Sequence, residues 1–272
     1  MSRLRPQMTT PTKTIAEAVR EIGGRGYTPE LLAYWAQRIR ASIQQTPRRE
    51  ASVMARAAMD AMYRKAIGRD LIKHHAGISR FTVESMQPNL RPLLRARIFA
   101  AADLIKLNRE QAMEVTLHRF AGWATSHPAG APLDQVEVRK HIGKRLQSSI
   151  YEDRRMLIDQ GHKLLAAVNQ TIAEGAGAIA AQWHHVHEAN YDARPEHVAR
   201  DGRIYLLRDS WAHKDGLIKP GRWGYSDEIT QPAQEPYCRC TFTFLYSLSR
   251  IPTDLLTEKG RKVMEQTRLR VV

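Results

Sequence analysis

Cysteine and long apolar segments are both scarce in this chain of 272 residues. Its two cysteines, Cys238 and Cys240, are too few for a disulfide scaffold, and their Cys-x-Cys spacing is poor for an unstrained bridge. The longest uncharged apolar stretch, residues 176–183, is far shorter than the roughly 20 residues of a membrane helix. The N-terminal residues also have no apolar core of a secretory signal. We therefore expect a protein that is made in a reducing cytoplasm and has no membrane partner.

Signatures of the common catalytic motifs are missing as well. The sequence has no His-Glu-x-x-His, no Walker A loop, no Gly-x-Ser-x-Gly elbow and no Gly-x-Gly-x-x-Gly after a predicted strand. No group of carboxylates is spaced like a nuclease metal site. Nothing in the sequence therefore requires an enzyme.

Acidic residues are outnumbered, with 28 Asp and Glu against 42 Lys and Arg. Residues 1–180 hold 28 basic and 16 acidic side chains, whereas residues 181–272 hold 14 and 12. This excess can attract a polyanion such as double-stranded DNA or an acidic protein surface, and a solvated arginine-rich helical surface is the alternative. The candidate DNA contacts are scattered arginines, namely Arg38, Arg40, Arg48, Arg49, Arg95 and Arg97.

Apolar periodicity predicts helices over most of the first 180 residues. Residues 1–12 are polar and are predicted to form a flexible arm. Thr28 and Pro29 have the residue types that begin a helix, and a very long helical pattern follows Asp134. We predict an elongated, basic and mainly helical region over residues 13–180.

The pattern changes near residue 181, where short strand-like runs alternate with turns rich in glycine and proline. The predicted strands cover residues 182–187, 203–207 and 240–246. A last helix is predicted from residue 251 to residue 269. The predicted fold class is therefore α+β, with a compact domain at 181–250 and a C-terminal helix and tail at 251–272.

A histidine and a carboxylate lie four residues apart in the segment before the second predicted strand. On a helical turn, His197 and Asp201 would share one face. Such a pair can transfer protons or bind a metal ion, and it can equally be a buried histidine held by an aspartate. The catalytic interpretation is a metal-dependent nuclease or other hydrolase that uses His197 and Asp201.

The two cysteines form the second candidate site. In a strand, side chains two residues apart point to the same face, so both sulfurs could bind one structural Zn²⁺ ion. His197 would be the third ligand, and the alternative is a pair of small buried thiols. Candidates for the fourth ligand are His184, His185, His187, His213 and Asp201.

Together these residues resemble a known family. Trp183, the series Asp192-x-Arg194-Pro195-x-His197-x-x-x-Asp201-Gly202, a spacer rich in glycine and proline, and the ending Cys238-Arg239-Cys240 are similar to the Mu F-like head morphogenesis domain. The domain occurs in minor head proteins of tailed bacteriophages, and the resemblance covers about residues 150–245. Family members often carry a Thr-Glu pair before the tryptophan. The corresponding residues 159–162 lack that acid, so no role of the glutamate is carried over.

The resemblance implies a structural virion protein. Such a protein is made in the host cytoplasm and lies inside the capsid near the portal. Its partners are the portal protein or the major capsid protein, and it assists head assembly and the packaging or ejection of DNA through non-specific contact. Its fold-defining cluster is expected to contain Trp183, Asp192, Arg194, His197, Asp201, Gly202, Cys238 and Cys240.

Overall fold

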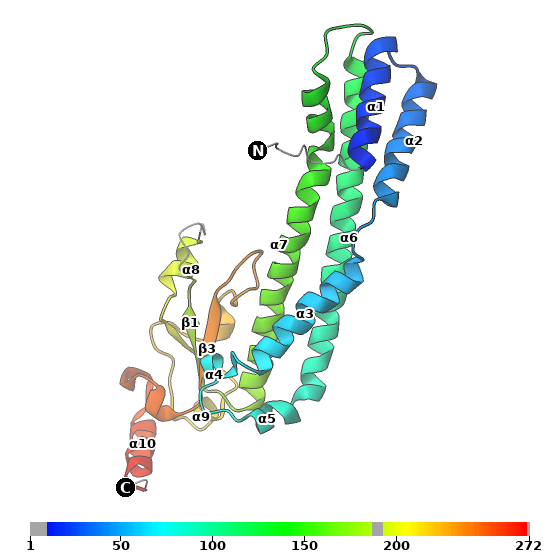
Figure 1. Cartoon of the computed structure of the whole chain (residues 1–272). Coiled ribbons are helices and arrows are strands. Elements are labelled where there is room, and N and C mark those ends of the chain that lie inside the picture. The colour runs from blue at the N-terminus through cyan, green and yellow to red at the C-terminus, as the bar shows by residue number, and fades with distance from the viewer. Residues whose placement is uncertain (1–9, 187–192, 271–272) are drawn as a thin grey trace, which may run out of the picture. The chain divides into compact units, whose positions relative to one another are not determined.

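The computed structural model describes residues 10–186 and 193–270 (Figure 1). No helix among these residues is long and apolar enough to cross a membrane. The fold is α+β, as predicted. Its helices are α1 (Thr10–Arg25), α2 (Pro29–Gln45), α3 (Ala51–Ile67), α4 (Leu71–His74), α5 (Arg80–Ser85), α6 (Gln87–Ser126), α7 (Gln135–Gly175), α8 (Pro195–Ala199), α9 (Trp211–Lys214) and α10 (Glu258–Arg270). Its strands are β1 (Ala180–His184), β2 (Ile204–Leu206) and β3 (Thr241–Leu245).

The chain divides into two compact units, each built from two separate segments. Unit 1 contains residues 1–54 and 102–156, and unit 2 contains residues 55–101 and 157–272. Unit 2 therefore combines the sheet with helical residues that precede it in the sequence. A flexible arm was predicted over residues 1–12. Residues 1–9 of this arm lie outside the described residues, and residues 10–12 belong to α1, which begins at Thr10.

Unit 1 is helical because its apolar residues recur at helical spacing. Helix α2 begins as the sequence predicts, since the Thr28 hydroxyl accepts a hydrogen bond from the backbone N–H of Leu31 (3.2 Å) and Pro29 occupies the first helical position. The buried faces of α1, α2, α6 and α7 form one apolar core, which includes Ile15, Ile22, Trp35, Ile39, Phe120 and Ile142.

A buried polar network joins α6 to α7 within unit 1. The Asn108 amide donates to the Ser149 carbonyl oxygen (2.9 Å) and to the Asp153 carboxylate (2.7 Å). The Arg109 guanidinium donates to the other oxygen of Asp153 (3.0 Å), and Arg145 donates to the Asn108 side-chain oxygen (2.8 Å). Asn108, Ser149 and Asp153 are all buried. Because each group has a specific partner, the network fixes how the two helices align along their axes.

Unit 2 contains a three-stranded antiparallel sheet in the order β2-β1-β3. The pairing sets Ala181 between Tyr205 and Phe244, and it sets Trp183 opposite Phe242. The three predicted strands are confirmed, and each is shorter than predicted; β1 also begins two residues earlier than predicted. Aromatic and small side chains of one face form a core that includes Trp183, Tyr205, Cys238, Cys240, Phe242 and Phe244.

The last helix begins later than the sequence pattern predicts. Residues Leu248–Arg250 and Thr253–Leu255 form 3₁₀ turns, and α10 begins at Glu258. Ile251, Leu255 and Leu256 are buried in the second core of unit 2, so this apolar segment packs as irregular chain. The prediction of a helix from residue 251 is wrong because the apolar spacing reflects burial of turns.

Candidate functional site

Three segments of unit 2 bring the predicted motif residues together. Strand β1 supplies Trp183, helix α8 supplies His197, and the segment that enters β3 supplies Cys238 and Cys240. Antiparallel pairing of Trp183 with Phe242 places the cysteines beside the tryptophan. The two distant halves of the motif therefore meet in one place.

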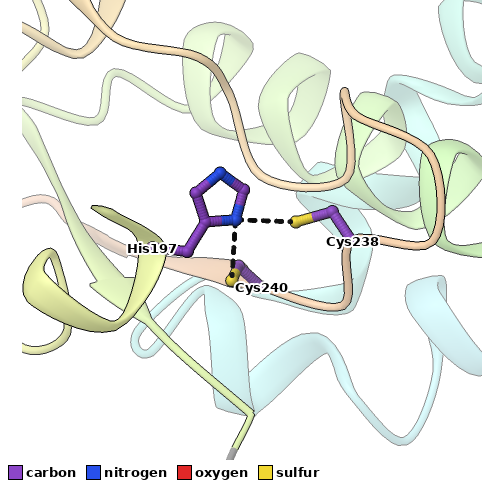
Figure 2. Close-up of side chains that lie close together, drawn as sticks. All are labelled: His197, Cys238 and Cys240. Atoms are coloured by element: carbon purple, nitrogen blue, oxygen red, sulfur yellow. Dashed lines mark hydrogen bonds between the residues drawn. The ribbon is translucent and has the colours of Figure 1, made fainter. Parts of the chain in front are cut away.

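His197 and both cysteines form a closed cluster (Figure 2). His197 Nδ1 lies 3.5 Å from Cys238 Sγ and 3.7 Å from Cys240 Sγ. The exposed fraction is 1% for His197, 0% for Cys238 and 2% for Cys240. The Trp183 ring packs edge-on against the imidazole, with centroids 5.2 Å apart and an interplanar angle of 70°. This arrangement excludes water from the sulfurs and from Nδ1 of the histidine.

The two thiols have opposite pKa shifts. The hydrogen bond between them lowers the pKa of Cys238 and raises that of Cys240, and burial adds to the increase at Cys240. The backbone N–H of Ala233 also donates to Cys238 Sγ (3.4 Å), which favours its ionised form. The cluster therefore stabilises negative charge on Cys238 Sγ.

The other nitrogen of His197 faces a carboxylate that the sequence analysis missed. His197 Nε2 lies 3.3 Å from a Glu235 oxygen, and the same oxygen forms an ion pair with Arg194 Nε (2.8 Å). Arg194 Nη2 also donates to the Pro236 carbonyl oxygen (3.2 Å). Arg194, a member of the expected cluster, is therefore held by contacts with Glu235 and with the backbone of Pro236. The carboxylate that faces His197 is Glu235, whereas the sequence spacing had suggested Asp201.

Asp201 and Gly202 form the turn between α8 and β2. The Asp201 carboxylate accepts a hydrogen bond from the backbone N–H of His185 (2.8 Å). Gly202 has a φ of 73°, a backbone conformation that side-chain-bearing residues rarely adopt, and its N–H donates to the Trp183 carbonyl oxygen (2.9 Å). This turn therefore ties the start of β2 to the end of β1.

Asp159 of α7 is a second acid that sequence reasoning passed over. One of its oxygens accepts the backbone N–H of Tyr237 (2.6 Å), and the other accepts Lys163 Nζ (2.5 Å). Tyr237 has a φ of 60° and directly precedes Cys238. Asp159 therefore holds the cysteine segment in an unusual backbone conformation, and it lies in the stretch that lacks the family's glutamate.

A cavity of about 550 Å³ lies beside the cluster in unit 2. Its lining includes the basic side chains of His74, Arg97 and Lys163 together with Cys240 and Phe242. Among the described residues that line it, Cys240 is the one member of the His–Cys cluster. The cavity therefore does not open onto the His197 ring.

The remaining predicted site residues have varied environments. Asp192 of the expected cluster and His187 of the possible zinc ligands lie outside the described residues. Of the candidate DNA contacts, Arg38, Arg40, Arg49 and Arg95 are exposed. Arg48 and Arg97 are half-buried, and they donate to Ser149 Oγ (3.4 Å) and to the Gln160 side-chain oxygen (3.3 Å).

No protein-family model, curated protein or solved structure matches this chain. The resemblance to the Mu F-like domain therefore depends on the motif residues themselves.

Proposed function

We propose that this protein is a minor head protein of a tailed bacteriophage. In this proposal it is a structural component of the virion, inside the capsid and close to the portal. It binds portal or capsid subunits, contacts double-stranded DNA without sequence preference, and assists head assembly and the packaging or ejection of DNA.

The observation that carries this proposal is the convergence of the motif residues on one buried cluster. His197 and the two sulfurs are almost completely buried, and the ring nitrogens of His197 face the sulfurs and Glu235. A hydrolase that uses His197 as a base would need its nitrogen within reach of substrate or water. The burial of this ring therefore supports a role in building the domain over a role in hydrolysis.

The charge of the chain supports contact with DNA. Unit 1 contains 18 basic and 11 acidic residues, and unit 2 contains 24 and 17, so each unit has a net charge of +7. A positive surface binds DNA by releasing counterions, which needs no base-specific contact. Both units can therefore contribute to binding.

Co-expression with a portal protein tests the proposal. The partner is the portal protein of the phage genome that encodes this chain, and the control is an unrelated ring-forming protein. We expect the chain to elute with the portal rings in size-exclusion chromatography and to be present in purified virions. A chain that elutes apart from portal and capsid proteins and is missing from virions would contradict the proposal.

DNA affinity is expected to fall steeply with salt. Changing Arg38, Arg40, Arg49 and Arg95 together to glutamine should weaken binding to DNA of any sequence. If each arginine contacts one phosphate, the slope of log K against log salt concentration should become shallower by about 4. Fluorescence anisotropy over a salt series measures this slope.

A matched set of exposed basic residues from the C-terminal third serves as the control. The substitutions are Lys214→Gln, Lys219→Gln, Arg222→Gln and Lys262→Gln. Equal effects of the two sets would overturn the assignment to the four arginines. An affinity that does not change with salt would remove the electrostatic claim altogether.

A further inference from the structure

The spacing of the donor atoms in the His–Cys cluster matches the coordination shell of a metal ion. Tetrahedral Zn²⁺ has Zn–S distances of about 2.3 Å and Zn–N distances of about 2.0–2.1 Å, which place neighbouring S and N ligands about 3.6 Å apart. The two S···N distances at His197 Nδ1 are 3.5 and 3.7 Å. All three donor atoms lie within 4.8 Å of one another. The same two distances also fit S–H···N hydrogen bonds, so the observation that points to a metal ion is the gathering of three donor atoms around one point.

A fourth donor approaches the cluster from the end of β1. His185 Nδ1 lies 3.6 Å from Cys240 Sγ, but His185 is not part of the group of donors that lie within 4.8 Å of one another, so its ring must turn toward the other donors to share an ion with them. The Asp201 carboxylate holds the backbone N–H of His185, which fixes the position of this residue next to the cluster. By contrast, the ring nitrogens of His213 are bonded to the Arg208 carbonyl oxygen (3.0 Å) and the Tyr225 hydroxyl (2.8 Å). His185 is therefore the best-placed fourth ligand among the histidines considered from the sequence.

The groups around the four donors are those that surround metal ligands. A histidine bound to a metal through one nitrogen commonly donates its other N–H to a carboxylate, which fixes the tautomer and raises the basicity of the ligand. Glu235 is 3.3 Å from His197 Nε2, and Arg194 holds Glu235 in turn (2.8 Å). The backbone N–H of Ala233 points to Cys238 Sγ (3.4 Å), where it can stabilise a thiolate.

We propose that His185, His197, Cys238 and Cys240 bind one structural Zn²⁺ ion and that Glu235 orients His197 as a ligand. With the His185 ring turned toward the three grouped donors, two thiolates and two neutral imidazoles would complete a tetrahedral shell with no open position for substrate, as in structural zinc sites. Binding converts both thiols to thiolates and releases their two protons to solvent. The ion links β1, α8 and the segment that enters β3. This proposal is independent of any portal partner.

Metal analysis of the full-length chain is the first test. The protein is purified without added metal, and its zinc content is measured by mass spectrometry. We expect one zinc ion per chain, and we expect Co²⁺ to replace it with the intense visible bands of tetrahedral cobalt and a thiolate-to-cobalt charge-transfer band. A chain that is folded, has two freely titrating thiols and gives no cobalt spectrum would overturn the proposal. A disulfide between the two cysteines would overturn it as well.

Point variants test the fourth ligand and the carboxylate. His185→Ala should reduce zinc affinity more than Glu235→Gln, for which a loss of about 10–100-fold is expected. The matched control is His184→Ala, because His184 is the neighbouring residue on β1 and should leave both affinity and cobalt spectrum unchanged. If His185→Ala behaves like the control, His185 is not the ligand. The cobalt spectrum of the wild-type chain gives an answer even where a variant does not fold.

Discussion

Replacing Asp153 by alanine is expected to lower the free energy of unfolding by about 3–5 kcal/mol. The Asp153 carboxylate is buried between Asn108 and Arg109, with contacts of 2.7 and 3.0 Å. Its removal leaves the Asn108 amide without one acceptor and a partly buried guanidinium without its counter-charge. Breaking such a buried pair costs more than the pair contributes, because the remaining charge stays desolvated. Urea denaturation followed by circular dichroism measures the change.

An exposed ion pair on α6, the helix of Asn108 and Arg109, provides the control for Asp153. Asp103 lies 3.4 Å from Lys106, and both side chains are largely exposed. Asp103→Ala is expected to change stability by less than about 1 kcal/mol, since solvent screens such pairs. If the two variants lose the same amount of stability, the network does not hold α6 against α7 as described.

Stability is expected to fall as the pH drops from about 6.5 to about 4 because of His75. Burial lowers the pKa of this histidine from its usual 6.5 to about 4. Its ring is stacked on Phe244, one nitrogen contacts the Tyr246 hydroxyl (2.6 Å), and the other contacts the Asn169 side-chain oxygen (3.3 Å). The folded state thus keeps His75 neutral.

The sign of this effect follows from proton uptake. Between pH 6.5 and 4 the unfolded chain protonates His75 and the folded chain does not, so falling pH favours unfolding. The full contribution, about 3 kcal/mol, is present above pH 6.5 and is lost as the pH reaches about 4. His74 also contributes to the loss of stability at low pH, since burial lowers its pKa as well.

Comparison with His75→Gln isolates the contribution of one residue. Glutamine does not titrate, so its stability curve should be flatter than that of the wild type over this pH range. Urea midpoints at half-unit intervals of pH measure both curves. The slopes of stability against pH are compared, because a loss of stability that is the same at every pH does not change the slope. Parallel curves would show that His75 is not held neutral by its surroundings.

Local signals in the sequence were enough to predict most of the fold. Thr28 and Pro29 mark the start of α2 by residue type, and Gly202 marks a turn because few other residues accept its backbone angles. The start of α10 could not be predicted from the sequence. Ile251 and Leu255 are buried in turns, and helical spacing of apolar residues does not distinguish buried turns from a buried helix face.

The candidate site was predicted in part. His197, Cys238 and Cys240 stand in a motif of fixed order, so their meeting in space was expected. Glu235 and Asp159 were missed because their roles depend on tertiary contacts with His197 and with the backbone of Tyr237. Neither acid has a spacing that marks it in the sequence.

The buried polar network shows a limit of pattern reasoning. Asn108 and Asp153 are polar residues on the buried faces of α6 and α7, since Asn108 lies at helical spacing from buried Ile105 and Asp153 lies at helical spacing from buried Ser149. In unit 1 they are buried and bonded to each other across the two helices. The polarity of a residue alone therefore does not show that it faces solvent, and the partner of each buried group is known only from the pairing of the helices.

The central claim is that His197 and the two cysteines hold the sheet domain together. Hydrogen exchange of the full-length chain, with His197→Ala compared with His184→Ala, tests it most directly. We expect faster amide exchange in β1, in α8 and over residues 235–245 of the His197 variant alone. Amides that stay as protected as in the wild type would show that these three segments do not depend on the cluster.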